Sequence, residues 1–193
     1  MIIDVIKQFN WFDIIIIILL LRVCYIAMNT GFTVEIFKLF GTLIAAYIGL
    51  HYYTSVTDFI DSRFTVTILP LEFIDFLSLL SLTILSYLMF FLLRISFSKL
   101  VKIETVSTLN RWGGLVLGIF RGILLASLVT FLMLISSVSY IRESAVKSYL
   151  GITFFEIAPN FYNATYNGLI SKFSPQEKSN EKNIEEIRKY FKE

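Results

Sequence analysis

Four long apolar runs dominate the chain and predict four membrane-spanning helices. A spanning helix needs about 20 mostly apolar residues, because the hydrocarbon core is about 30 Å thick and each helical residue rises about 1.5 Å. The runs cover residues 9–28, 36–53, 74–95 and 112–135. We therefore expect an all-α, polytopic integral membrane protein. Its transmembrane domain would cover residues 1–141, and residues 142–193 would form a short, partly helical, extramembrane tail that is amphipathic and charged.

Other architectures fit the pattern less well. Barrel strands alternate with a period of two, whereas these runs are continuously apolar. The helices of a soluble bundle carry a polar face, but the small polar residues of 76–93 are only serines and a threonine. The apolar stretch of the first run follows Asp4, Lys7 and Asp13 rather than a basic leader, and no A-x-A cleavage site follows it. We expect this run to be retained rather than removed as a signal peptide.

Two segments allow more than one interpretation. Residues 122–141 carry no charge, so the last helix could instead extend over 112–141, about 45 Å, by tilting or by leaving the bilayer. In that frame Arg121 lies nearer to the membrane surface. Residues 95–110 either lie along the cytoplasmic surface as an amphipathic helix or form an ordinary loop.

The tail contains a further helix signal. Ser174, Pro175 and Glu177 match a helix start with a serine cap and a proline in the first turn. The stretch that follows has a thin apolar stripe made of Ile184, Ile187 and Phe191. We expect a short amphipathic helix there.

The positions of lysine and arginine predict the orientation, because cytoplasmic loops carry an excess of these residues. Six lie at the first and third junctions between spans, namely Arg22, Lys38, Arg94, Lys99, Lys102 and Arg111. The opposite side has two, Lys7 and Arg63, among six acidic residues. We therefore expect both termini on the external side of the membrane.

Small residues recur at four-residue spacing on two of the spans. The second span carries Gly41, Ala45 and Gly49, and the fourth carries Gly114, Gly118 and Gly122. Helices in lipid associate through small residues, because these residues let two backbones approach closely. The two matching ridges predict a close contact between the second and fourth spans. Glycine is also commoner in membrane helices in general, so an explanation by composition alone stays open.

Charged residues in or beside the apolar runs are a second signal, because a charge at the centre of a spanning helix costs about 2.5–3.5 kcal/mol on insertion scales. They are Asp13 near the outer end, and Arg22, Glu35, Arg111 and Arg121 near the cytoplasmic end. Glu35 and Lys38 face each other at i,i+3. We expect Glu35 to be the acceptor for a basic cluster of Arg22 and Arg111, with Arg121 as a further candidate. In the alternative, each arginine reaches the headgroups alone.

Composition excludes several classes of protein. The chain has 193 residues, of which 56% are hydrophobic and 17% charged, so intrinsic disorder is excluded. A formal net charge of +2 provides no basic field for nucleic acid. The single cysteine, Cys24, and the single histidine, His51, leave a metal site without ligands. His51 stands beside Tyr52 and Tyr53 at a membrane end, where an interfacial role is favoured over that of a base. Since no catalytic motif occurs, we expect no catalytic residue, no cofactor, no metal and no enzymatic activity.

Three motifs carry a resemblance to a known family. They are Asn10-Trp11-Phe12-Asp13 before an isoleucine/leucine run, then Gly31-Phe32-x-x-Glu35-x-x-x-Leu39-x-Gly41, then Leu109-Asn110-Arg111-x-x-Gly114-x-x-x-Gly118-x-x-Arg121-Gly122. Over about residues 10–150 the chain resembles the colicin V production (CvpA) family of bacterial membrane proteins, and Ser148-Tyr149-Leu150 looks like a further short motif of that family. The chain departs from the pattern at residues 27–30, where arginines are usual, and at Asn110, where aspartate is common. Residues 174–193 look like a variable extension.

The resemblance implies a bacterial inner-membrane protein linked to colicin V production or export and to envelope physiology. Two functions from different classes follow. The first is a scaffold or assembly factor in bacteriocin production or export and in envelope maintenance, whose partners are the lipid bilayer and either further copies of itself or other membrane and envelope proteins. The second is a subunit of a small-solute or ion transporter or channel, with Asp13, Glu35 and Arg121 along its pathway.

Overall fold

The computed structural model describes residues 9–64, 70–100, 107–174 and 176–190. Within these ranges the chain is helical and contains no strand, which confirms the all-α fold class. Among the described residues, four helices are long and apolar enough to cross a membrane: α2 (Trp11–Thr30), α3 (Phe32–Phe64), α4 (Leu71–Leu100) and α5 (Ser107–Ile135). We call these four helices the spanning bundle.

The four helices of the spanning bundle correspond to the four predicted spans: α2 has the predicted length and is shifted by two residues, whereas α3, α4 and α5 are longer than their apolar runs. The largest difference is in α3, which continues eleven residues beyond the predicted end at 53, to Phe64. Apolar length marks where a helix leaves lipid, whereas the backbone hydrogen bonds continue through Asp58 and Asp61 in more polar surroundings. At the other end of the bundle, α4 runs to Leu100 and α5 begins at Ser107. The middle of the segment 95–110, residues 101–106, lies outside the described residues, so the choice between a surface helix and a loop stays open.

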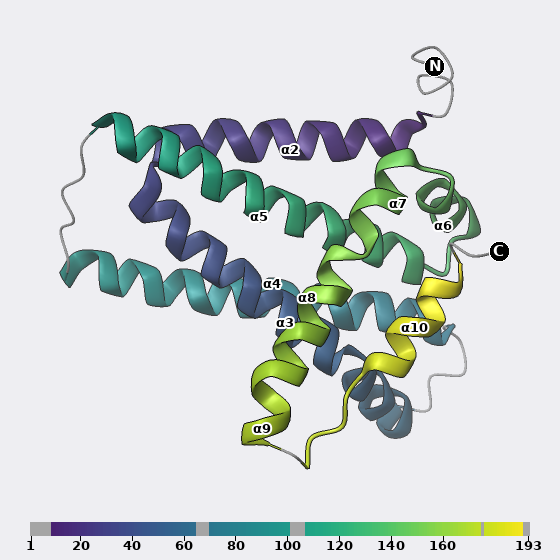
Figure 1. Cartoon of the computed structure of the whole chain (residues 1–193). Coiled ribbons are helices and arrows are strands. Elements are labelled where there is room, and N and C mark those ends of the chain that lie inside the picture. Colours follow the sequence, from purple (N-terminus) through teal and green to yellow (C-terminus); the bar gives the residue numbers. More distant parts are fainter. Residues whose placement is uncertain (1–8, 65–69, 101–106, 175, 191–193) are drawn as a thin grey trace.

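Successive helices of the spanning bundle run in opposite directions along the chain. In space they pack in the order α2, α5, α3, α4 (Figure 1). Each inner helix therefore has two main neighbours. The outer helix α4 packs mainly on α3 and exposes a row of large apolar side chains, including Leu85, Met89 and Leu92. Such an exposed apolar surface is what a helix in contact with lipid requires.

Helix α5 ends at Ile135, so the longer frame over 112–141 is wrong. The break is stabilised by contacts of Ser136 with Val138 and with Arg142 of the next helix. Ser136 Oγ accepts a hydrogen bond from the amide of Val138 at 3.3 Å, and Arg142 Nη2 donates to the carbonyl of Ser136 at 2.9 Å. These contacts satisfy backbone groups that the helix would otherwise leave unpaired.

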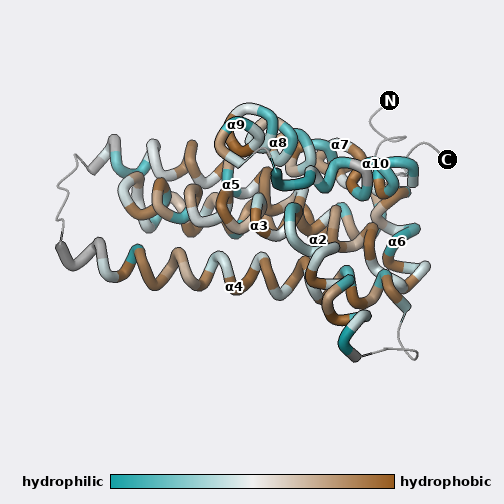
Figure 2. Tube along the Cα trace, turned by 90° about the horizontal axis from the view of Figure 1, so that it is seen from below, coloured by the Kyte–Doolittle hydropathy of each residue, from teal (hydrophilic) through white to brown (hydrophobic). Residues whose placement is uncertain are grey.

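In the part of the chain that the structure describes, six short elements follow this break. They are α6 (Ser139–Val146), α7 (Tyr149–Phe155), α8 (Ile157–Thr165), the π-helical turn η1 (Tyr166–Ile170), α9 (Ser171–Phe173) and α10 (Glu181–Lys189). Of these, α6, α7 and α8 pack directly on the spanning bundle. Helices α7 and α8 run across α5 and α3 rather than along them (Figure 1). Figure 2 shows α7–α10 on one side of the bundle and α4 on the other.

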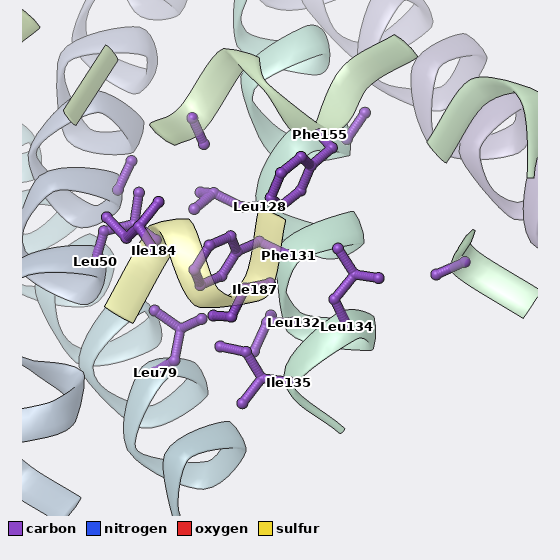
Figure 3. Close-up of a cluster of buried hydrophobic side chains, with 14 of the residues drawn as sticks. Leu50, Leu79, Leu128, Phe131, Leu132, Leu134, Ile135, Phe155, Ile184 and Ile187 are labelled. Carbon is purple, nitrogen blue, oxygen red and sulfur yellow. The ribbon is translucent and has the colours of Figure 1, made fainter. Parts of the chain in front are cut away.

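Helix α10 contributes to the hydrophobic core. Its two buried isoleucines, Ile184 and Ile187, point into a cluster that also contains Leu50 of α3, Leu79 of α4 and Phe131 of α5 (Figure 3). Removing these two isoleucines from water favours the packing of α10 on the bundle, at about 25 cal/mol per Å² of apolar surface. The end of the described chain is therefore held on the bundle by packing.

The predicted helix start at Ser174 is wrong, because α10 begins at Glu181 after Asn180. The capping pattern needs the glutamate to turn back toward the serine. Instead, the carboxylate of Glu177 accepts a hydrogen bond from Tyr52 on α3. A contact to a distant helix thus replaces the local cap.

Candidate functional site

The junction between α2 and α3 is built around Gly31 and Asn110. Gly31 has a φ of 81°, a conformation that glycine adopts without strain. Asn110 Oδ1 accepts a hydrogen bond from the amide of Phe32 at 2.7 Å and so caps α3 from another helix. A Cβ atom at position 31 would overlap the Asn110 side chain. Both the backbone conformation and the contact with α5 therefore require glycine here.

One turn beyond this junction, Glu35 lies at the centre of a buried ionic cluster, and its side chain is 0% exposed. One carboxylate oxygen, Oε1, lies 2.6 Å from Lys38 Nζ and accepts a hydrogen bond from Thr30 Oγ1 at 2.6 Å. The other, Oε2, lies 3.1 Å from Arg121 Nη2 on α5. Lys38 also donates to Thr30 Oγ1 at 3.3 Å. One carboxylate thus connects the end of α2, the first turns of α3 and the middle of α5.

The cluster corrects the expected set of basic partners. Glu35 pairs with Arg121 and Lys38, whereas Arg22 and Arg111 are exposed. The reason is the helical turn: ten residues bring Arg111 about 80° around α5 from Arg121, away from the side that meets Glu35. The i,i+3 spacing of Glu35 and Lys38 signals that contact in the sequence, but no local pattern indicates Thr30.

The glycine ridges also have partners other than those predicted. On α5, Gly114 and Gly118 pack against Ala27 of α2, and Gly122 faces Leu20 and Val23 of the same helix. On α3, Gly41 faces Phe90 and Gly49 faces Thr83, both on α4, while Ala45 is buried. The predicted contact between the second and fourth spans is present, but the glycines of the two ridges do not face each other. Each ridge lets a different neighbour approach, and α3 and α5 contact through other residues.

At the opposite end of α2, the buried carboxylate of Asp13 connects two helix starts. Its Oδ1 accepts hydrogen bonds from Ser148 Oγ at 2.6 Å and from the amide of Leu150 at 2.8 Å. Its Oδ2 accepts from the amide of Asn10 at 2.8 Å and completes the cap of α2. Carboxylates are favoured at helix N-termini, where backbone amides are unpaired and the helix dipole is positive. Asp13 therefore stabilises α2 and α7 at once.

His51 occupies a third polar cluster between α3 and the C-terminal helices, and it is 5% exposed. Its Nδ1 lies 2.9 Å from the hydroxyl of Tyr162, and its Nε2 lies 3.3 Å from Glu177 Oε1. Tyr52 donates to the same Glu177 oxygen at 2.5 Å. The hydrogen bond from Tyr52 and the proximity of His51 hold the pKa of Glu177 below its ordinary value. Burial raises the pKa of Tyr162, so its hydroxyl stays protonated.

Asn180 fastens the same segment to α3. Its side-chain amide donates to the carbonyl of Leu50 at 2.7 Å, and Thr54 donates to its Oδ1 at 3.1 Å. Its backbone amide donates to the hydroxyl of Tyr162 at 2.9 Å. We call Glu177 and Asn180, with their partners on α3, the C-terminal latch. The position of His51 beside two tyrosines gives no indication of these distant partners.

Within the described ranges, no group of three histidine, cysteine, aspartate or glutamate side chains lies close enough to hold a metal ion. A cavity of about 440 Å³ opens between α3, α4, α5 and α10, and its charged lining residues are Asp58, Glu72, Asp75, Arg142 and Glu186. Arg142 stacks over the ring of Tyr190 at 5.0 Å. The polar clusters around Glu35, Asp13 and His51 each connect side chains of different helices.

Comparison with known proteins identifies the family. A model of the family described as "Colicin V production protein" matches residues 12–156, about three-quarters of the chain. The match begins in the first turn of α2 and ends directly after α7, so it includes Asp13, Glu35, Arg121 and Ser148, while Glu177 and Asn180 of the C-terminal latch lie beyond it. Neither the curated proteins nor the solved structures provide a match. The resemblance seen in the sequence is confirmed, and the protein is a multi-pass membrane protein that belongs to the colicin V production family.

Proposed function

We propose that this protein is a membrane scaffold or assembly factor that acts in bacteriocin production or export and in envelope maintenance. One observation carries the proposal: its deeply placed charges are engaged in contacts between its own helices. Glu35 is paired with Arg121 and Lys38, and Asp13 accepts three hydrogen bonds from α2 and α7. Groups used in this way fix the relative positions of helices and present a defined surface to partners.

The same contacts argue against a pathway for solutes. A pathway needs polar groups that line a water-filled space between helices. Asp13 and Glu35 are both 0% exposed and lie near opposite ends of α2. The two carboxylates therefore stabilise two separate helix junctions and do not line one continuous pathway for solutes.

The location and partners follow from the family and from the charge distribution. We propose the bacterial inner membrane, with both termini on the external side, because lysine and arginine concentrate at the junctions α2–α3 and α4–α5. The lipid bilayer surrounds the spanning bundle. Further copies of the chain or other envelope proteins are the partners that a scaffold requires.

A subunit of a small-solute or ion transporter is the second candidate. The observation in its favour is the buried Glu35–Arg121 pair, because ionisable groups inside membranes often belong to proton or ion pathways. In this function several copies of the chain would assemble to enclose a pathway between their spanning helices.

Flux measurements on the purified protein distinguish the two functions. The protein is reconstituted in liposomes that carry a potassium gradient and an internal pH-sensitive dye. The scaffold predicts proton and potassium fluxes equal to those of protein-free liposomes. A protein-dependent flux that Glu35→Gln abolishes, while Arg111→Gln retains it, would establish transport.

Affinity capture from native membranes, with the tag on the tail, tests the scaffold directly. The proteins captured with the wild type are compared with those captured with Asp13→Ala. A scaffold predicts a defined set of partners with the wild type and a reduced set with Asp13→Ala.

A further inference from the structure

The exposed side of the segment from α7 to α9 is almost free of charge. Large apolar side chains project from it: Tyr149 is 47% exposed, Ile152 54%, Leu169 56% and Phe173 84%. The other exposed residues in this segment are small or uncharged except for one, and they are Thr153, Asn160, Ala164, Asn167, Gly168 and Lys172. Its single acidic residue, Glu156, pairs with Arg188 at 2.7 Å.

Helix α10 has the opposite character, although it packs against the same side of the bundle. Its isoleucines are buried, and its exposed positions include Glu181, Glu185, Glu186 and Lys189. Figure 2 shows α10 as markedly hydrophilic. The exposed side chains of α7–α9 therefore favour an apolar environment, whereas those of the adjacent helix α10 favour water.

The segment starts beside the lipid-facing surface of α2. Ser148, the cap of α7, bonds to Asp13, and the residues that follow Asp13 on α2 include the exposed Ile14, Ile15 and Ile18. From there the segment crosses α5 and α3 instead of continuing away from the bundle (Figure 1). Its apolar exposed side chains thus continue a surface that lies in lipid.

We propose that α7, α8, η1 and α9 lie in the interface of the bilayer, at the boundary between headgroups and acyl chains, and that α10 faces water. Interfacial helices place apolar and aromatic side chains at this boundary, where tyrosine is enriched. The lack of charge fits the glycerol and upper acyl region better than water. In this arrangement the bilayer partner is the leaflet at the Asp13 end of α2, whichever side of the membrane that is.

Site-directed spin labelling tests the arrangement in the full-length protein. Cys24 is the single cysteine, so Cys24→Ser provides a background free of thiols. Labels are attached at Ile152→Cys and Phe173→Cys in liposomes. Leu85→Cys on α4 is the control for lipid, and Glu185→Cys on α10 is the control for water. All four positions are exposed, so the substitutions leave the core unchanged. Collision rates are measured with oxygen, which concentrates in lipid, and with a water-soluble nickel chelate.

The proposal predicts a ratio of oxygen to nickel collisions at positions 152 and 173 that lies between those of the two controls, and clearly above that of Glu185→Cys. A ratio equal to that of Glu185→Cys would overturn it and place the segment in water. Loss of collisions with both reagents in native membranes, together with water-like collisions in liposomes of the purified protein, would also overturn it, because the surface would then be covered by another protein.

Discussion

Arg121 of α5 and Glu35 of α3 form an ion pair, Nη2 to Oε2 at 3.1 Å, in which neither side chain is more than 7% exposed. Lys38 approaches the other carboxylate oxygen, so two cations depend on one anion. Removing one partner of a buried pair leaves the other charge without compensation, at about 3–5 kcal/mol. The asymmetry of this cluster makes the cost depend on which partner is removed.

We predict that Glu35→Gln destabilises the protein more than Arg121→Gln does. The first change leaves two cations unpaired and costs about 3–5 kcal/mol, whereas the second leaves Glu35 still paired with Lys38 and Thr30. The double variant should show a coupling energy of about 0.5–3 kcal/mol. Unfolding in mixed micelles, titrated with a denaturing detergent, measures all three values. Arg111→Gln on the same helix is exposed and should change stability by less than about 0.5 kcal/mol. Equal effects of the two single changes would contradict the role of Lys38.

Gly114 should be far less tolerant of substitution than Gly122 or Gly168. A Cβ at position 114 would lie 2.6 Å from the carbonyl oxygen of Ala27 and 2.9 Å from the carbonyl carbon of Gly31, and backbone atoms cannot move aside cheaply. We expect Gly114→Ala to lower the free energy of unfolding by about 1–3 kcal/mol or more. At Gly122 the nearest atom is a leucine methyl at 3.2 Å, so Gly122→Ala should cost less.

Gly168→Ala is the matched control for these changes, because nothing lies within 4 Å of a Cβ at that position. Alanine has a higher helix propensity than glycine by up to about 1 kcal/mol, so this variant should be neutral or slightly more stable. Thermal unfolding in detergent ranks the three variants. If Gly114→Ala melted at the same temperature as Gly168→Ala, the close contact of α2 with α5 would be disproved.

The length and apolarity of the runs were sufficient to predict the four spans, because the bilayer imposes both properties on any helix that crosses it. The same reasoning could not predict the end of α3, because the helix continues past the apolar run through the polar positions Asp58 and Asp61. The end of α5 at Ile135 could not be predicted either, because uncharged residues follow it and Arg142 supplies one of the contacts that stabilise the break.

Partners between helices were harder to predict than the residues that need them. The spacing of Gly114 and Gly118 shows a surface made for close approach, but nothing in a one-dimensional pattern distinguishes α2 from α3 as the neighbour. Glu35 was recognised as an acceptor because buried charge requires compensation. His51 could not be assigned a partner, because Tyr162 is 111 residues further along the chain, in a segment with weak periodicity.

Asp13→Ala should loosen α7 without unfolding the spanning bundle. The change removes the acceptor for the hydroxyl of Ser148 and for the amides of Asn10 and Leu150, and each buried donor left unpaired costs about 1–3 kcal/mol. Hydrogen exchange should accelerate at the first amides of α7 and α2, and exchange in the centre of α3 should not change. Asp61→Ala, which removes an exposed carboxylate of α3, is the control and should leave all three regions as in the wild type. Uniform acceleration over the whole chain would show a global rather than a local role.

The C-terminal latch should open in acid. The hydrogen bond from Tyr52, with His51 nearby, lowers the pKa of Glu177 in the folded protein, so the carboxylate binds its proton more weakly there than in the unfolded chain. The stabilisation is therefore fully present above the unfolded pKa, about 4.3, and is lost as the pH falls through the lower folded pKa. A spin label at Glu185→Cys in the Cys24→Ser background should gain mobility below about pH 4.3. Glu177→Gln cannot ionise, so its label should be more mobile at neutral pH and should lack this acid transition. Superimposable titrations of the two proteins would show that another carboxylate holds α10 on the bundle.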